Sequence, residues 1–192
     1  MPTVSKRARS SVRRFPRRWA LVLVLGLTVA ILSIAAPALA NPTHNGANPN
    51  KCLDADTNGL NSNGTKMQLW HCYGGTNQEW DWGPLGLGGR EIINRANGKC
   101  LDADANNVTH DGAKVQLWNC WGGANQLWAI AWPDTSGRFQ ILNVASGKCL
   151  DADSGHITDD GDRVQLWSCW YTGSVSIGGN TYYIPAPNQA WS

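Results

Sequence analysis

An aspartate, a Gln-x-Trp pair and an Asn-Gln pair recur three times along this chain. In the first copy they are Asp54, Gln68, Trp70, Asn77 and Gln78. A carboxylate accepts hydroxyl hydrogen bonds, an amide donates and accepts them, and an indole ring offers a flat apolar face. A pyranose ring has an apolar C–H face and a rim of hydroxyls, so this combination suits the binding of a sugar.

The other two copies keep every one of these residue types. The second copy has Asp102, Gln116, Trp118, Asn125 and Gln126, and the third has Asp151, Gln165, Trp167, Asn188 and Gln189. No copy has lost its aspartate or its tryptophan. We therefore expect up to three sites of the same kind.

Some of the repeated residues also have a structural interpretation. The last tryptophan of each copy is expected in the core, because large aromatic side chains dominate core burial. The glutamine before it in the motif is a candidate for satisfying buried backbone groups, and the first tryptophan could also pack inward. A third aromatic position could extend the aromatic surface or cover a cysteine bridge. The last tryptophans are Trp80, Trp128 and Trp191, and the glutamines before them are Gln78, Gln126 and Gln189. The first tryptophans are Trp70, Trp118 and Trp167, and the third aromatic residues are Tyr73, Trp121 and Trp170.

Catalysis and metal binding are weaker interpretations of the same residues. Asp54 and Asp56 are spaced like paired glycosidase carboxylates, but three copies of one dyad in so small a domain would be unusual. The four histidines share no repeat position, so no recurring base is visible. Asp54 to Gly59 also matches the opening of an EF-hand loop, yet lacks its closing glutamate. We expect no enzyme activity, no metal and no cofactor.

The motif belongs to a long internal repeat. The stretch 98–128 matches 50–80 without a gap, and it recurs from Gly147 until an insertion at 172–187 interrupts it. One copy cannot bury its apolar face alone, so three should form one domain. Short strands with frequent turn signals predict an all-β fold, with strands at 51–56, 65–72, 78–82, 91–95 and 139–144. Within the insertion, 174–177 and 181–184 flank Gly-Gly-Asn and predict a hairpin.

Six cysteines lie at two fixed places in the repeats, always 20 residues apart. The repetition favours the pairing that is the same in every copy, which would close a loop within each repeat and require an oxidising compartment. A zinc site is the alternative, but the spacing matches one poorly. The expected pairs are Cys52 with Cys72, Cys100 with Cys120, and Cys149 with Cys169.

Residues 1–40 have the composition of a secretory signal peptide. A basic segment precedes an apolar one, and Ala38, Leu39 and Ala40 form a cleavage site before Asn41. Seven of the 16 Lys and Arg lie in this segment, so nine remain against 14 Asp and Glu, a formal net charge of −5. We expect a secreted protein with no basic surface for nucleic acid and no membrane attachment after cleavage. An uncleaved anchor is the alternative, and the export route stays open.

The triple CLD, QLW and N-Q-x-W pattern with its cysteine spacing closely resembles the ricin B-type lectins, also grouped as family 13 carbohydrate-binding modules. The resemblance covers 50–191. It implies a β-trefoil over 41–192, with repeats at about 41–82, 83–131 and 132–192, and one sugar pocket per repeat. It also implies that Asp54, Trp70 and Asn77, supported by Gln68 and Gln78, contact sugar, as do their counterparts in the other copies.

Two departures from that family pattern affect the expected fold. Residues 43–46 stand where the second repeat has Glu91 to Asn94, yet contain no apolar residue to bury, and only Ser192 follows Trp191. The barrel seam is therefore expected to be open or frayed, or completed by another chain. The insertion at 172–187 lies beside the third pocket, where it could form a wall, block the pocket or be a longer turn.

Together these observations predict a secreted carbohydrate-binding lectin module that gains strength on polymeric glycans through avidity. Galactosides, xylan and arabinan all remain open as ligands, because sugar choice depends on the placement of individual hydroxyl partners. The alternative is a non-catalytic trefoil that inhibits a protease or binds a protein partner, with non-functional sugar pockets.

Overall fold

A computed structural model describes residues 43–192 apart from 87, 132, 133 and 135, and leaves out the side chain of Ile177. The predicted signal peptide, residues 1–40, lies outside the described residues. In the described part, no helix is long and apolar enough to cross a membrane.

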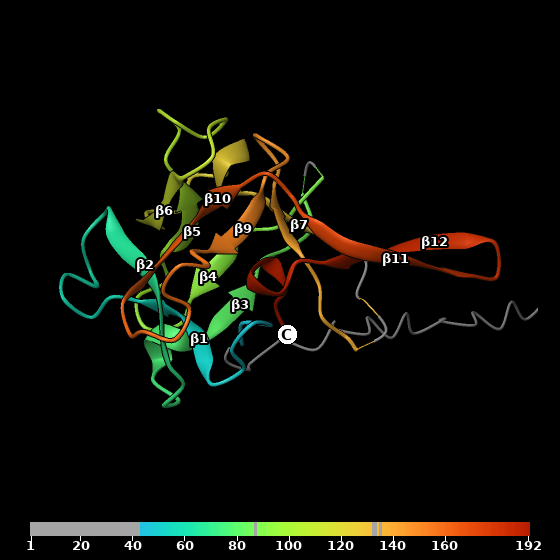
Figure 1. Cartoon of the computed structure of the whole chain (residues 1–192). Coiled ribbons are helices and arrows are strands. Elements are labelled where there is room, and N and C mark those ends of the chain that lie inside the picture. The colour runs from blue at the N-terminus through green and yellow to red at the C-terminus, as the bar shows by residue number, and fades with distance from the viewer. Residues whose placement is uncertain (1–42, 87, 132–133, 135) are drawn as a thin grey trace, which may run out of the picture. The chain divides into compact units, whose positions relative to one another are not determined.

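The described residues form short strands and three one-turn 3-10 helices (Figure 1). The strands of the first repeat and its link are β1 (Lys51–Ala55), β2 (Thr65–His71), β3 (Trp80–Trp82) and β4 (Ile92–Asn94). Those of the second are β5 (Cys100–Ala103), β6 (Ala113–Trp118), β7 (Trp128–Ile130) and β8 (Ile141–Asn143). The third has β9 (Cys149–Ala152), β10 (Asp162–Trp167), β11 (Tyr171–Ile177) and β12 (Asn180–Pro185). The 3-10 turns are η1 (Thr76–Gln78), η2 (Ala124–Gln126) and η3 (Pro187–Gln189).

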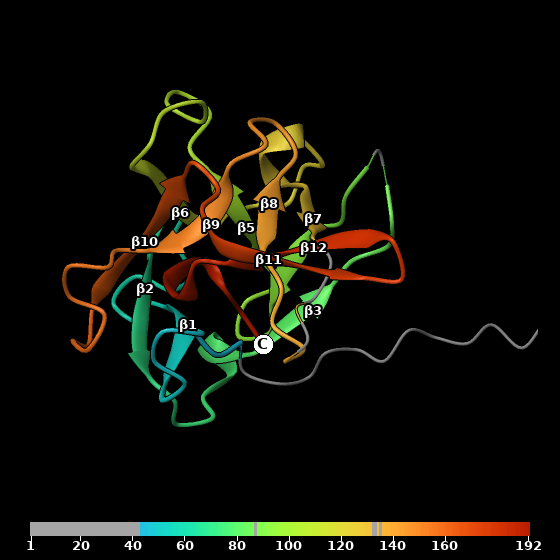
Figure 2. The same cartoon turned by 45° about the vertical axis from the view of Figure 1, so that its right-hand side comes forward.

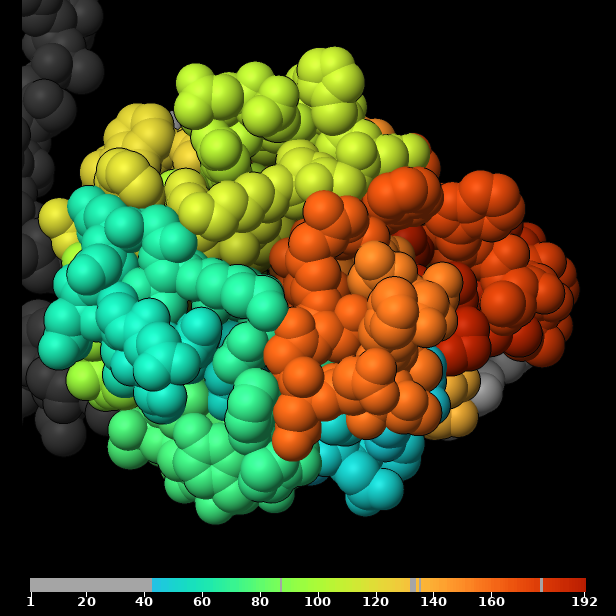
Figure 3. Space-filling view, turned by 60° about the vertical axis from the view of Figure 1, so that its left-hand side comes forward, coloured from blue at the N-terminus to red at the C-terminus, as the bar shows by residue number. Residues whose placement is uncertain are grey.

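Three strands that carry the QLW motif, β2, β6 and β10, pair with one another in a closed antiparallel ring. Each also pairs with the strand before it, giving the hairpins β1–β2, β5–β6 and β9–β10. Figure 3 shows the resulting three lobes, coloured cyan to green, yellow-green and orange, meeting around a common centre. This threefold arrangement is a β-trefoil, as the sequence resemblance implies.

Strand alternation divides each hairpin between core and surface. Successive side chains in a strand point to opposite faces, so Leu53 and Leu69 enter the core while Asp54 and Gln68, which are cross-strand partners, face the other way. The closing tryptophans Trp80, Trp128 and Trp191 are at most 1% exposed. Their placement in the core is confirmed.

The indole N–H of each core tryptophan donates to the carbonyl of the leucine that follows the first cysteine of the same repeat. The distance to Leu53 O is 3.1 Å in the first repeat, and the equivalent bonds are 2.9 and 3.1 Å in the second and third. A buried N–H without an acceptor would be costly, so these bonds fix where each ring sits.

The barrel seam is closed within the chain, which corrects the expected open or frayed seam. His44 N donates to Ser192 O at 2.9 Å, and Ser192 N donates to His44 O at 3.1 Å. The register also differs by one residue from that expected, because His44 pairs with Cys52 as Ile93 pairs with Cys100. Asn45, not Gly46, therefore corresponds to Asn94. Backbone pairing holds the seam without the apolar side chains that the sequence lacks.

The insertion forms the predicted hairpin, longer than expected and separate from the trefoil sheet. β11 and β12 project from the third repeat in both ribbon views (Figures 1 and 2). The other predicted strands are confirmed to within a few residues at their ends, except that Gln78 belongs to η1 and not to β3.

All three predicted disulfides are present, each closing a loop of 20 residues within one repeat. The cysteines are thus bonded to one another, which rules out the zinc interpretation of their spacing. Each bridge joins the first strand of a hairpin to a cysteine one or two residues beyond the end of the second strand.

Candidate functional site

Each repeat carries one surface pocket between its Asp, its QLW strand and a nearby aromatic residue. The pockets of the first, second and third repeats have volumes of about 400, 390 and 470 Å³. The repeated aspartate, the first glutamine and the first tryptophan line all three. The second aspartate of the D-x-D motif, Asp56, Asp104 or Asp153, lines them as well. The lining includes Asp54, Gln68, Trp70 and Tyr73; Asp102, Gln116, Trp118, Trp121 and Asn125; and Asp151, Gln165, Trp167, Trp170, Asn188 and Gln189.

A buried hydrogen-bond network holds the aspartate at the base of each pocket. In the first repeat, Gln68 Nε2 donates to Asp54 Oδ1 at 3.0 Å. Asn77 Nδ2 and Gln78 Nε2 donate to Oδ2 at 2.8 and 2.9 Å. Strand β2 supplies Gln68, and η1 supplies Asn77 and Gln78. The tight 3-10 turn is what brings two amides to one carboxylate oxygen.

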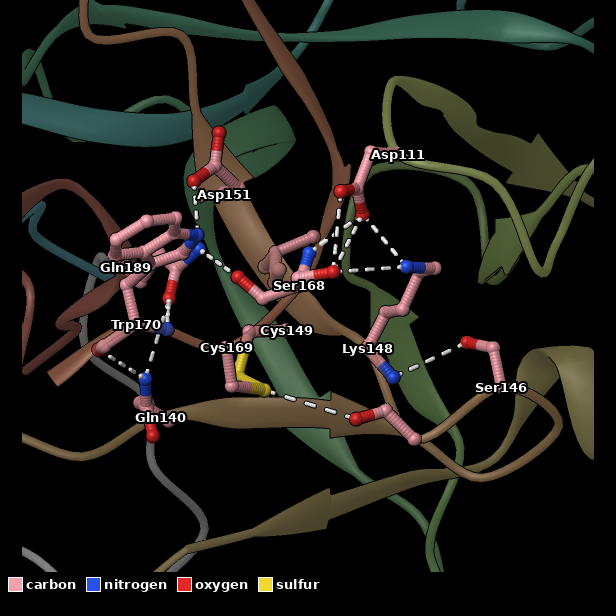
Figure 4. The surroundings of a disulfide bond; sticks show 12 residues. Asp111, Gln140, Ser146, Lys148, Cys149, Asp151, Ser168, Cys169, Trp170 and Gln189 are labelled. Atoms are coloured by element: carbon pink, nitrogen blue, oxygen red, sulfur yellow. Dashed lines mark hydrogen bonds and ion pairs between the residues drawn. A yellow bond between two sulfur atoms is a disulfide. The ribbon is translucent and has the colours of Figure 1, made fainter.

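The same network occurs in the other repeats. The three amide–carboxylate bonds measure 3.1, 2.9 and 2.9 Å around Asp102, and 3.0, 2.9 and 2.9 Å around Asp151. Figure 4 shows Gln189 linking Asp151 to the backbone of Ser168 and Trp170. The structure therefore brings together all five predicted residues in every repeat.

The final glutamine of the motif satisfies backbone groups, as the structural interpretation predicts. Gln78 Oε1 accepts from Tyr73 N at 3.0 Å, and its Nε2 also donates to His71 O at 3.0 Å. Gln126 makes the equivalent bonds. Both are fully buried behind their pockets, whereas Gln189 also lines the third pocket.

Burial dominates the electrostatics of the aspartates. Asp54 is 2% exposed, and Asp102 and Asp151 are each 3% exposed. Desolvation raises the pKa of all three carboxyls, while the amide hydrogen bonds act in the opposite direction. Each carboxylate is thus largely occupied by protein donors. Its role is to orient the surrounding amides as well as to offer an oxygen at the pocket base.

The tryptophan of each QLW motif lies at the pocket surface and not in the core. Trp118 is 39% exposed, and Trp70 and Trp167 are partly exposed. Each ring lies near a glycine of another repeat: a Cβ added to Gly64 would be 4.0 Å from Trp118 Cζ3. Gly64 has a φ of +90°, which favours glycine, and its N–H donates to Leu117 O at 2.8 Å. Each of these rings therefore lies beside a turn of a neighbouring repeat.

A second aromatic residue forms the rim of each pocket. Tyr73, Trp121 and Trp170 are each at least half exposed. Trp121 lies so close to Gly123 that an added Cβ would be 2.1 Å from the ring, so only glycine fits beneath it. Of the two interpretations given for this position, the structure supports an extended aromatic surface, because all three line a pocket.

The first pocket differs from the others at this rim. Tyr73 Oη donates to Asn77 Oδ1 at 2.6 Å, so this amide oxygen already accepts one hydrogen bond from within the chain. Trp121 and Trp170 have no hydroxyl, and Asn125 and Asn188 line their pockets while Asn77 does not line the first. The sequence shows a tyrosine where the other two repeats have tryptophan, but it does not show that the hydroxyl of Tyr73 reaches Asn77.

The second carboxylate of the D-x-D motif stabilises a turn. Asp56 Oδ1 accepts from Asn58 N at 2.8 Å, and Asp104 and Asp153 accept from the backbone two residues on in the same way. This pattern is an Asx turn, which supports the turn interpretation of the EF-hand-like sequence.

Polar contacts that join neighbouring repeats were not predicted from the sequence. Lys148 Nζ lies 2.6 Å from Asp111 Oδ1, which also accepts from Ser168 N (Figure 4). The corresponding groups are Lys51, Asp160 and His71 at one junction and Lys99, Asn63 and Asn119 at another. A repeated lysine just before each first cysteine was the available signal. It joins repeats and does not enter the pockets.

Comparison with known proteins places this geometry in a family. A family model described as ricin-type beta-trefoil lectin domain-like matches residues 44–118, 76–167 and 124–191. No curated protein sequence matches the chain.

Several solved structures share the fold. The designed 3-fold symmetric protein ThreeFoil is 31% identical over 78% of this chain and 93% of its own, with a TM-score of 0.62. An exo-beta-1,3-galactanase from Clostridium thermocellum is 25% identical over 78% of this chain, with a TM-score of 0.62, but only 28% of that enzyme is covered. The Macrolepiota procera ricin B-like lectin, solved in complex with lactose, is 19% identical over 78% of this chain and 90% of its own, with a TM-score of 0.59.

The family match runs from the first strand pair to the last core tryptophan and includes all three pockets. The chain belongs to the family of ricin-type beta-trefoil lectin domain-like proteins.

Proposed function

We propose that the protein is a secreted lectin module that binds sugar units of a polysaccharide or glycan through its three repeat pockets. The observation that carries this proposal is the threefold recurrence of one open pocket with an exposed indole, an ordered amide and a carboxylate. A flat ring face and fixed polar groups suit a pyranose ring. The likeness to carbohydrate-binding neighbours, including a lectin solved with lactose, supports the same class of ligand.

Binding fits the pocket chemistry better than catalysis. Asp54 is surrounded by amide donors, so it is not free in the way that a general acid or a nucleophile requires, and Asp56 uses one carboxylate oxygen to accept from the backbone in a turn. The open aromatic platforms also favour sugar binding over the protease-inhibitor alternative, which has no comparable supporting feature in the described residues.

Polymeric glycans containing galactose, xylose or arabinose are the proposed ligands. Three shallow pockets on separate lobes favour weak single contacts that act together on one polymer. A glycan array, followed by retention on immobilised galactan, xylan and arabinan, identifies the sugar. Retention by none of these, with no array signal, would contradict the proposal.

The aromatic platforms provide the sharpest variants. The replacements Trp70→Ala, Trp118→Ala and Trp167→Ala together should abolish retention, because each removes an apolar face worth about 1.5–3 kcal/mol. Leu85→Ala is the matched control, since Leu85 is an exposed apolar residue outside the pockets. Equal retention of the triple variant and the control would show that the pockets do not bind sugar.

Secretion is part of the proposal. Disulfides persist in oxidising compartments, and the three bridges fit export of the chain. Mass spectrometry of the exported protein should give Asn41 as its first residue. An N-terminus at Met1 on a membrane-bound product would instead support an uncleaved anchor.

A further inference from the structure

A groove of about 550 Å³ lies along one face of the β11–β12 hairpin and extends to the barrel, outside the three repeat pockets. Tyr171, Tyr182, Tyr183 and Pro185 line it from the hairpin, and Gln140 and Ala131 line it from the barrel. Only the third repeat carries this hairpin, so the groove has no counterpart in the other two.

Strand pairing places Tyr171 and Tyr183 on one face of the hairpin. Tyr171 pairs with Pro185, and Tyr183 lies two residues from Pro185, so alternation along β12 puts these side chains on the same side. The rings of Tyr171 and Tyr183 have centroids 5.1 Å apart. They are 46% and 59% exposed, which leaves a paired aromatic surface open to a ligand.

A buried amide lies at the barrel end of the groove. Gln140 is 2% exposed, and its Nε2 donates to Trp170 O and Gln189 Oε1, both at 3.3 Å (Figure 4). Within the described part of the chain, no donor bonds to its Oε1, although that atom is not sealed from solvent. Buried side-chain oxygens normally have a partner. Gln140 Oε1 is therefore an acceptor available to a ligand hydroxyl.

The described lining of the groove is neutral. Asn180 adds an amide and Thr181 a hydroxyl, and none of the described lining residues is charged. An aromatic face with amides and hydroxyls at its edge fits a ring that has one apolar face and several hydroxyls. A charged ligand would lose its hydration there without gaining an ion pair.

We propose that this groove is a separate binding site for a neutral carbohydrate. It lies on the other side of the hairpin base from the third pocket, because Trp170 and Ala186 line that pocket while their neighbours Tyr171 and Pro185 line the groove. The hairpin thus does more than lengthen a turn. It adds a fourth contact for a glycan, and this proposal does not depend on binding in the repeat pockets.

The tyrosines allow the groove and the first pocket to be followed in one experiment. The chain has four, of which Tyr73 lines the first pocket and Tyr171, Tyr182 and Tyr183 line the groove. In the protein labelled with ¹³C-tyrosine, ring resonances are recorded by NMR during titration with neutral hexasaccharides of galactose, xylose or arabinose. A hexasaccharide of galacturonic acid serves as the charged comparison.

We expect at least one neutral hexasaccharide, at millimolar concentration, to shift the resonances of Tyr171 and Tyr183, and the acidic one to have no effect. A shift of Tyr73 alone would support binding at the first pocket and overturn the groove site. Shifts of Tyr171 and Tyr183 without Tyr73 would support the groove site and count against binding at the first pocket. No shift of Tyr171 and Tyr183 with any neutral sugar, or an equal shift with the acidic one, would overturn the proposal.

Variants test whether the rings themselves bind. Tyr171→Ala with Tyr183→Ala should weaken binding at the groove by about tenfold per ring, followed through the Asn180 amide resonance. The Phe replacements at both positions keep the aromatic face and should retain most of the affinity. Val175→Ala is the matched control, because Val175 is an exposed apolar residue of the same hairpin that does not line the groove. Unchanged binding in the double Ala variant would refute the site.

Discussion

In the first pocket, the hydroxyl of Tyr73 competes with a ligand hydroxyl for one hydrogen-bond acceptor. Tyr73 Oη donates to Asn77 Oδ1 at 2.6 Å, and that oxygen is the acceptor whose counterparts, on Asn125 and Asn188, belong to residues that line their pockets. A sugar hydroxyl at the first pocket would compete with the phenol for this amide oxygen. Tyr73→Phe keeps the ring over Gly75 and removes only the hydroxyl, so it should strengthen sugar binding at this pocket.

The size of the expected gain in affinity follows from the strength of one hydrogen bond between neutral groups. A protein hydrogen bond contributes about 0.5–1.5 kcal/mol net. If the ligand hydroxyl replaces the phenol on Asn77 Oδ1, the gain should be about 1 kcal/mol, or roughly fivefold in Kd. Tyr73→Trp should give a similar gain, because it reproduces the rim of the second pocket.

Isothermal titration calorimetry tests this in a background where only the first pocket remains. Trp118→Ala and Trp167→Ala remove the aromatic platforms of the second and third pockets. The titrant is the sugar that binds best on the glycan array. The same Tyr73 replacements with Trp70→Ala added serve as the control and should show no gain. An unchanged or weaker Kd for Tyr73→Phe would mean that the phenol itself contacts the sugar, and the competition argument would be wrong.

Three further predictions concern stability. Asp102→Ala should lower the free energy of unfolding in urea by about 1–3 kcal/mol for each amide donor left unpaired, and melting unchanged from the wild type would refute its role at the centre of the network. Burial raises the pKa of Asp160, but hydrogen bonds from Lys51 and His71 outweigh this effect and hold the pKa at about 2. The contribution of Asp160 to the free energy of unfolding is therefore present above pH 3.8 and lost as the pH falls towards 2. Asp160→Asn, which copies Asn63 at another junction, should therefore destabilise the protein near neutral pH but not near pH 2, and a pH-independent difference between the two proteins in urea melts would contradict this. Replacing Cys100 and Cys120 by Ser should lower stability by about 3 kcal/mol in thermal or urea unfolding, since the bridge closes a loop of 20 residues; a variant as stable as the wild type would show that the bridge adds nothing.

Repetition made most of the fold predictable. Features that occur three times, such as the cysteine pairs and the core position of Trp80, had to satisfy the same environment in every copy, and each is confirmed. The hairpin in the insertion was predictable for a local reason, since Gly178 and Gly179 favour the turn.

Features that depend on three-dimensional closure were not predictable. The seam around Asn45 looked weak because its side chains are polar, but backbone hydrogen bonds and one extra residue before Lys51 close it. Periodicity assigned Gln78 to a strand, whereas a 3-10 turn places it behind the pocket. The Asp residues were predicted to contact sugar from their chemistry and from the family resemblance, and only the structure shows how far the neighbouring amides already occupy them.

The strand that carries each QLW motif is held across repeat boundaries, since β6 pairs with β2 of the preceding copy and with β10 of the last. A synthetic peptide of the second repeat alone would therefore carry every residue that lines its pocket and still lack the two strands that hold β6 in place. It could regain them only by assembling with two others of its kind, so the folded fraction of the peptide would rise steeply with its concentration, whereas that of the intact chain would not.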